Sequence, residues 1–484
     1  MRTSTPSTSL PPTATPPSIT PAGALPPASP PTTRGRIVTT VRAELRAAVT
    51  NGHAPDLATL RAAPREELAQ ALVELSPPEL GRLITRLGDE GLAALIAEID
   101  AVDAARLLRK LGLAQAADVL EEMDPDDAAD VVGELHPEEA EAVLVAMHQE
   151  EAREVRDLLA YPPESAAGIM TPDFVAVAPY LTVHEALEEL GRVAEEVETV
   201  YYVYATDPAT RTLLGVLSLR NLALAPRWKL VSQLMLMDVT RVRADEDQET
   251  AARLLEQHNL LALPVVDELG RLLGIITADD AADVLLEEAG EDMERLGGSL
   301  PLDEPYLRAS IVHLFRKRIG WLLVLFVAEA YTGTVLRHFE ATLSEMVSLA
   351  FFIPLLIGTG GNTGSQTVTT LIRAMAVGEV RFRDLWRVLR REVCVGALLG
   401  VVMGLVTYAR AWMLGVGVEV GPVVAVTALF IVLWAASVAA ILPLILQRLK
   451  IDPAVVSAPL ISTLVDGTGL LLYFEIARLM LGLD

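Results

Sequence analysis

The chain has 484 residues, 51% of them hydrophobic, and this length predicts several domains. Residues 1–300 carry 24 Lys and Arg against 51 Asp and Glu, whereas residues 301–484 carry 15 against 13. The acidic first part lacks the basic footprint that nucleic acid requires and favours cations as partners, and the single cysteine, Cys394, excludes an internal disulfide or a cysteine-based zinc site.

Residues 1–33 predict a disordered tail, because a Pro, Ser and Thr tract follows Arg2 where a signal peptide needs an apolar run. Residues 34–162 predict an acidic helical domain. Apolar residues recur there at helical spacing, and proline with acids stands at several expected helix starts, as in "DPDDAADVVGEL". We expect a cytosolic α-helical superhelix of the solenoid type.

Residues 163–285 contain one pattern twice. "MTPDFVAVAPYLTVHEALEEL" from Met170 parallels "MLMDVTRVRADEDQETAARLL" from Met235, and "LLGVLSLRNLALA" parallels "LLGIITADDAADVL". Each repeat predicts an entry strand, a helix, two strands joined by a tight turn, and a second helix. The stretches Gly215–Asn221 and Gly274–Asp280 share a Gly-apolar-apolar-Ser/Thr-x-x-Asp/Asn pattern. The segment therefore resembles a tandem pair of CBS domains, which implies an α+β fold.

Residues 286–312 predict an acidic connecting helix, and residues 313–484 predict a transmembrane domain of five helices. Its apolar runs are each long enough to cross a bilayer and cover about 319–337, 346–377, 392–415, 421–446 and 454–482. Lys and Arg gather at alternate ends of these runs, at 316–318, 381–391 and 448–450. The positive-inside rule then predicts a multi-pass protein of the inner (plasma) membrane, with cytosolic N-terminal domains and the C-terminus outside.

Two expected spans carry polar residues at bilayer depth. The second contains "PLLIGTGGNTGSQTVTT", where glycines permit close backbone approach and Asn362 supplies an oxygen. The fifth contains Asp466, and an intramembrane carboxylate, which costs about 3 kcal/mol to insert, by default indicates an ion pathway. Oxygen donors without a His or Cys cluster favour a hard divalent cation such as Mg2+.

Active transport and catalysis are not expected from these residues. "GTGGNTGSQT" lacks the lysine of a phosphate-binding loop. No activated nucleophile or acid–base pair has a convincing setting, so the chain is not expected to be an enzyme. Transport would then be passive and driven by the membrane potential.

Three features carry a resemblance to a known family: the order of the modules, "GGN" in the second span and "DPA…S…P…T…D…G" in the fifth. Over nearly everything after residue 34, the chain resembles the MgtE family of magnesium channels. The resemblance implies a homodimer in the lipid bilayer, with a pore between the subunits lined by the second and fifth helices. It implies that Asp466 is the pore carboxylate, and it places near the path Asn362, Gly360, Gly361 and Ser462. Ala458 departs from the Asn or Gly that family members often carry there.

The acidic domains also predict a cation sensor, because bound divalent cations would relieve repulsion between like charges and draw domains together. The resemblance implies that cytosolic Mg2+ closes the pore by binding at the interfaces of the helical domain, the CBS pair and the connecting helix. The expected ligands are the carboxylates of Asp247, Glu249, Asp280, Asp283, Glu288, Glu291, Asp126 and Asp130, with Asp452 at the cytosolic mouth. Asn259 stands where an acid is expected.

CBS pairs in some relatives hold adenine nucleotides, which makes ATP a candidate modulator here. Thr277 and Asp280 would supply a hydroxyl group and a ribose-binding acid. No basic phosphate-binding residues stand nearby in the sequence.

Two other functions fit the same residues. The chain could be a channel or secondary transporter for Co2+, Mn2+ or Ca2+, because water-mediated oxygen ligands select by hydration and cavity size rather than by residue type. It could also be a non-transporting membrane receptor in which the CBS pair senses a nucleotide. Asp466 would then be a structural carboxylate.

Overall fold

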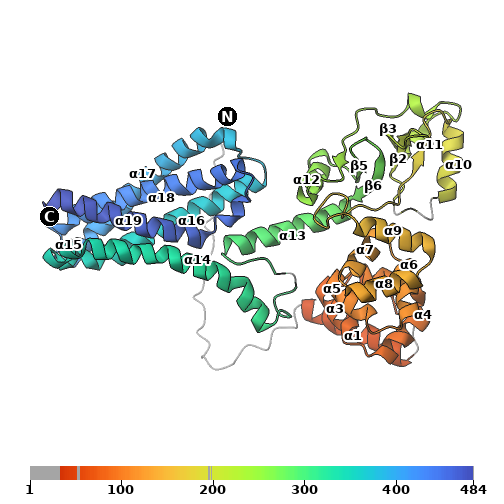
Figure 1. Cartoon of the computed structure of the whole chain (residues 1–484), viewed down its shortest axis with the longest axis horizontal. Helices are drawn as coiled ribbons and strands as arrows, with labels where there is room; N and C mark the ends of the chain where they lie inside the picture. Colours follow the sequence, from red (N-terminus) through yellow and green to blue (C-terminus); the bar gives the residue numbers. More distant parts are fainter. Residues whose placement is uncertain (1–32, 52–54, 194–196, 198, 303, 483–484) are drawn as a thin grey trace, which may run out of the picture. The chain divides into compact units, whose positions relative to one another are not determined.

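The computed structural model describes residues 33–51, 55–193, 197, 199–302 and 304–482. The predicted tail, residues 1–33, therefore lies outside the described residues except for Thr33. The chain divides into two compact units at Arg153 and Glu154. Figure 1 draws the first unit in red and orange, the CBS segment in yellow and green, and the C-terminal helices in blue.

The first unit is built of short helices with local start signals. They are α1 (Thr33–Asn51), α2 (Leu57–Arg61), α3 (Arg65–Val73), α4 (Pro77–Ile96), α5 (Ala101–Leu108), α6 (Leu113–Glu121), α7 (Pro125–Gly133), α8 (Pro137–Ala146) and α9 (Gln149–Leu159), which crosses into the second unit. The carboxylates of Asp56 and Asp100 accept first-turn amides, and prolines open α4, α7 and α8. Leu80 and Leu83 bury one face of α4. The predicted helical domain is confirmed.

Two small sheets confirm the predicted sequence repeat. The first sheet contains β1 (Ala176–Val177), β2 (Tyr202–Thr206) and β3 (Leu213–Ser218), and the second contains β4 (Val242–Arg243), β5 (Ala262–Val266) and β6 (Leu272–Thr277). In each sheet the first strand is parallel to the second, which is antiparallel to the third. Helices α10 (Val183–Val193), α11 (Leu219–Leu224) and α12 (Gln248–His258) and the 3-10 turn η1 (Val231–Gln233) complete the pair. The two hairpin turns also pair with each other at Thr212 and Arg271.

The connecting helix begins inside the second CBS repeat. Helix α13 (Ala278–Leu296) follows β6 directly, with Thr277 as its N-cap residue, so the predicted boundary between residues 285 and 286 falls within one helix. Gly297 and Gly298 end it, and Gly298 has φ 76°, a conformation that glycine adopts without strain. The predicted segment 286–312 therefore contains the second half of α13 and, at its end, the first residues of α14. A rotation of the second CBS repeat would also move the end of α13.

In the part of the chain that the structure describes, five helices are long and apolar enough to cross a membrane, as predicted. They are α14 (Ile311–His338), α16 (Ile353–Ala376), α17 (Leu385–Met413), α18 (Val420–Arg448) and α19 (Ala458–Leu481), with short connections α15 (Glu340–Glu345), η2 (Val347–Phe352), η3 (Phe382–Asp384) and η4 (Pro453–Val455). Helix α18 has the highest mean hydropathy, 2.6. It packs against α16, α17 and α19, which lie beside it in Figure 1.

Glycines permit the close contact between α17 and α18. A Cβ atom on Gly400 would lie 2.7 Å from Leu429 Cδ1, and one on Gly404 would lie 2.8 Å from the Ala425 carbonyl oxygen. Since real Cβ atoms essentially never come this close, the two backbones approach where small residues allow it. This contact helps to fix α18, against which the two polar spans pack.

Candidate functional site

Helices α16 and α19 form a close pair because glycines on α16 face large side chains on α19. A Cβ atom on Gly364 would lie 2.5 Å from Ile461 Cγ2, and one on Gly361 would lie 3.1 Å from Ser462 Oγ. A Cβ atom on Gly360 would meet Ile431 of α18 at 2.6 Å and Val465 of α19 at 2.8 Å. Gly360 is thus buried in a contact of three helices.

This contact predicts a stability effect. Gly360→Ala should lower the melting temperature of the detergent-solubilised protein by several degrees, since overpacking costs about 1–3 kcal/mol. Gly358→Ala on the same helix is the matched control, because nothing lies within 4 Å of a Cβ atom there; it shares the gain in helix propensity. Equal melting temperatures for the two variants would contradict the packing role of Gly360.

Hydroxyl groups connect α16 to α19 at the level of Ser462. The Ser365 and Ser462 hydroxyl oxygens lie 3.2 Å apart. The Ser462 hydroxyl also donates to the Gly361 carbonyl oxygen at 3.5 Å, and that of Ser365 donates to the Ala458 carbonyl oxygen at 3.4 Å. Ala458, which departs from the family pattern, therefore still supplies an oxygen through its backbone.

Asp466 lies half-buried on α19, one turn after Ser462. Its Oδ1 atom is buried and has no hydrogen-bond partner among the described residues. A Cβ atom on Gly361 would lie 3.6 Å from this oxygen, so the glycine leaves room in front of the carboxylate. Because a buried carboxylate oxygen without a donor is costly, a proton, a cation, a water or a group from another molecule would stabilise Asp466.

Asn362 lies on α16 next to these glycines but is exposed in the single chain. Gly361 and Gly364, by contrast, are buried against α19. The structure thus brings together Gly360, Gly361, Ser462 and Asp466 and leaves Asn362 on an outer face. Their roles in conduction stay predictions.

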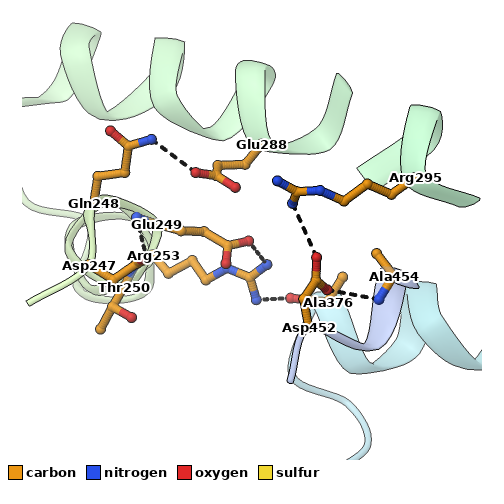
Figure 2. Close-up of polar contacts among 10 residues, drawn as sticks. All are labelled: Asp247, Gln248, Glu249, Thr250, Arg253, Glu288, Arg295, Ala376, Asp452 and Ala454. Atoms are coloured by element: carbon orange, nitrogen blue, oxygen red, sulfur yellow. Dashed lines mark hydrogen bonds and ion pairs between the residues drawn. The ribbon is translucent and has the colours of Figure 1, made fainter. Parts of the chain in front are cut away.

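The second group of predicted residues lies where the second CBS repeat meets the membrane domain. Asp247 is the N-cap residue of α12 and accepts the amides of Glu249 (3.0 Å) and Thr250 (3.2 Å). Figure 2 shows Arg253 bonded both to the Glu249 carboxylate and to the carbonyl oxygen of Ala376, the last residue of α16. A guanidinium group at a helix C-terminus satisfies free carbonyl groups and the helix dipole.

The end of α13 makes a similar contact. Arg295 donates to Glu291 on its own helix at 2.6 Å and to Asp452 at 3.1 Å, while Asp452 also accepts the Ala454 amide at 2.8 Å. Gln248 of α12 donates to Glu288 of α13 at 2.9 Å. Asp452 therefore lies against the connecting helix, where we expected it.

Negative charge accumulates in this region. Asp292 is half-buried, and burial, followed by the nearby carboxylates of Asp452 and Glu249, raises its pKa to about 6. Burial also raises the pKa of Glu249, although Arg253 opposes this shift. The carboxylates of α12, α13 and η4 are therefore close enough to repel one another.

The remaining predicted ligands lie apart from this cluster. Asp280 is twelve residues before Asp292 on α13, about 18 Å along the helix; it accepts the Thr277 hydroxyl, and its pKa is raised by burial. Asp283 lies one turn after it. Asp126 and Asp130 lie on α7 in the first unit.

Two departures from the expected site have local explanations. Asn259 ends α12 in the left-handed conformation, with φ 49°, which Asn tolerates better than most residues. The Thr277 hydroxyl, expected to bind a nucleotide, instead donates to Asp280, and Thr277 is buried. A nucleotide would have to break this bond.

Over the described residues, no group of three or more His, Cys, Asp or Glu side chains lies in an arrangement that could hold a metal ion. The acids at the α12–α13–η4 contact instead pair with Arg253 and Arg295. Sequence reasoning missed both arginines. A local pattern was available for the arginines, since each stands four residues after an acid, Glu249 or Glu291.

Comparison with known proteins identifies similar families along the chain. The family described as the MgtE intracellular N domain matches residues 64–164, CBS domains match 166–227 and 231–287, and the MgtE family, described as a divalent cation transporter, matches 353–476. The magnesium transporter MgtE of Thermus thermophilus is 44% identical over 328 residues, which are 68% of this chain and 72% of the relative. That of Bacillus subtilis is 36% identical over 330 residues, 67% and 71% of the two chains.

Two solved structures are also similar. The crystal structure of the soluble part of a magnesium transporter is 31% identical, with a TM-score of 0.46, and the match covers 53% of this chain and 99% of that one. The cytosolic domain of the Mg2+ channel MgtE in complex with ATP is 33% identical, with a TM-score of 0.38, and the match covers 50% and 99%.

Proposed function

We propose, from the premise that this chain belongs to the MgtE family of magnesium transporters, that it is a Mg2+-selective channel. The family makes the chain a membrane transporter of divalent cations rather than an enzyme. Uptake would be passive, because a potential of 100 mV supplies about 2.3 kcal/mol per elementary charge and twice that for a divalent ion.

The unpartnered Oδ1 atom of Asp466 carries this proposal. An intramembrane carboxylate persists when it serves an ion path, and Mg2+ prefers oxygen ligands that it contacts directly or through its waters. Hydroxyl and carbonyl oxygens of Ser365, Ser462 and Gly361 lie on the same pair of helices. They supply further oxygens for a hydrated cation.

A homodimer with the pore between its subunits accounts for the outer position of Asn362. In this proposal, α16 and α19 line the pore, and Asp466 faces its symmetry mate. In the same proposal, the domains before α14 are cytosolic and the C-terminus is outside, a topology that the clusters of Lys and Arg at 316–318, 381–391 and 448–450 support.

We further propose that cytosolic Mg2+ closes the channel. Burial first, and then the nearby carboxylates of Asp452 and Glu249, raise the pKa of Asp292, and a divalent cation would lower the repulsion between these carboxylates. The oxygen ligands would come from Asp247, Glu249, Glu288, Glu291 and Asp452, with Asp280, Asp283, Asp126 and Asp130 as further candidates. Because α13 is continuous with the second CBS repeat, ion occupancy at either end of this helix would bias one two-state gate.

Flux into proteoliposomes tests both proposals. Purified protein is reconstituted with a Mg2+-sensitive dye inside, and Mg2+ on the side of the CBS domains is varied. We expect uptake at low Mg2+ and closure at high Mg2+. A protein that passes no divalent cation would favour the receptor hypothesis, and faster uptake of Co2+, Mn2+ or Ca2+ than of Mg2+ would assign another cargo.

Arg295 should act as an internal competitor of Mg2+ for Asp452 and Glu291. Arg295→Gln removes that competing cation, so we expect half-closure at a several-fold lower Mg2+ concentration. Arg271→Gln is the matched control, since its ion pair with Asp267 lies on the distant β5–β6 turn. Unchanged or higher Mg2+ at half-closure in Arg295→Gln would contradict competition.

ATP remains a proposed modulator of the CBS pair through Thr277 and Asp280. Because these two side chains bond to each other and are largely buried, ATP binding requires their rearrangement. Titration of the purified protein with ATP, with Thr277→Val as the comparison, measures this directly.

A further inference from the structure

Helix α14 carries one charged residue at bilayer depth that no motif predicted. Glu329 is the only charged residue between Ile319 and Leu336. In this span 11% of the most apolar 18-residue stretch is buried, which is the lowest share among the five spans. Its side chain is exposed in the single chain. Since a charge on a lipid-facing surface at this depth costs about 3 kcal/mol, Glu329 should face a polar neighbour rather than lipid.

Helix α14 packs against α19, the helix that carries Asp466. A Cβ atom on Gly467 would lie 2.6 Å from Tyr331 Cδ1 and 3.3 Å from the hydroxyl oxygen of Thr332. Glycine at position 467 therefore lets α14 approach the turn that carries Asp466.

Thr332 supplies a separate observation. It is three residues after Glu329 and so lies on the same side of α14. Its side chain is 7% exposed, and its hydroxyl has no hydrogen-bond partner among the described residues. Buried hydroxyl groups in membrane helices usually donate to a carbonyl of the preceding turn. An unused hydroxyl here leaves an oxygen available beside Gly467, the residue after Asp466, whose Oδ1 atom also has no partner among the described residues.

We propose that Glu329 is a second carboxylate of the cation path and that Glu329, Thr332 and Asp466 present their oxygens to one hydrated divalent cation. Two carboxylates and a hydroxyl are hard oxygen donors, which suit Mg2+ bound through its waters. This inference rests on the proposed channel function. It adds α14 to a path otherwise formed by α16 and α19.

The test compares Mg2+ uptake by Glu329→Gln with that of the wild-type protein in proteoliposomes over a range of external Mg2+. We expect the half-saturating Mg2+ concentration to rise about tenfold, because the cation loses one attracting charge at short range. Glu329→Asp should restore it to within about threefold. Glu340→Gln, at the start of α15 beyond the end of α14, is the control and should match the wild type.

The possible results separate this inference from the proposed function. If the wild type conducts, Asp466→Asn is silent and Glu329→Gln keeps the wild-type half-saturation, the second carboxylate is refuted while the channel stands. If the half-saturating Mg2+ concentration rises as much for Glu329→Asp as for Glu329→Gln, and both variants melt at a lower temperature than the wild type, Glu329 is structural. A wild-type protein that carries no Mg2+ refutes the channel itself.

Discussion

Asp466→Asn should lower Mg2+ uptake about 100-fold or more while leaving the folded protein intact. The amide has the same shape as the carboxylate but no charge. A unit charge pair at 4 Å is worth about 4 kcal/mol at an effective dielectric constant of about 20, and the cation here is divalent. Because Asp466 Oδ1 has no protein donor in the described residues, the substitution breaks no hydrogen bond to that atom.

The measurement is the initial rate of dye response in proteoliposomes at low Mg2+. Asp238→Asn is the control for an exposed acid, and Asp466→Glu, which keeps the charge, should retain part of the uptake. Size-exclusion profiles of all variants must coincide. Normal uptake by Asp466→Asn would remove the pore assignment and leave Asp466 a structural residue.

Much of the fold was predictable because the relevant patterns are local. The stretches that form β3 and β6 repeat one apolar pattern around Gly215 and Gly274. Such a repetition indicates a shared fold even when each copy is short. The spans were predictable from length and hydropathy alone, as for α18 with a mean hydropathy of 2.6.

The partners of the two arginines could not be predicted. Arg253 bonds to a carbonyl 123 positions away, and Arg295 to a carboxylate 157 positions away, so their sequence neighbours explain only the local ion pairs. The continuity of α13 across residue 285 could not be predicted for another reason: the acidic composition changes there, but no helix-ending residue precedes Gly297 except Gly290, which α13 tolerates. Composition and backbone structure need not change at the same residue.

The candidate pore residues show the same limit. The family resemblance placed both glycines of "GGN" near the path, yet a Cβ atom on Gly360 would meet Ile431 and Val465, whereas one on Gly361 would lie 3.6 Å from Asp466 Oδ1. Neighbouring glycines in a helix point about 100° apart, so a motif cannot distinguish a packing glycine from one beside a path. Glu329 was missed because it belongs to no motif.

Neutralising four acids of α12 and α13 should abolish closure without abolishing conduction. The variant combines Asp247→Asn, Glu249→Gln, Asp280→Asn and Asp283→Asn. Mg2+ shifts the gate only by its differential affinity for the closed state, and these changes remove proposed ligands at the start of α13 and at the start of α12. To move a gate from 1% to 99% closed requires about 10⁴-fold preference, so the loss of part of the ligand set should leave the channel open at Mg2+ concentrations that close the wild type.

The matched control removes the same number of charges elsewhere in the CBS pair, through Glu188→Gln, Glu189→Gln, Asp238→Asn and Glu268→Gln, all at exposed positions. Wild-type closure in this control would show that position, not net charge, determines the response. If the sensor variant closes normally, the sensor lies elsewhere. If it is shut even without Mg2+, repulsion between these acids holds the wild-type gate open, and Mg2+ acts by screening that repulsion rather than by bridging the domains.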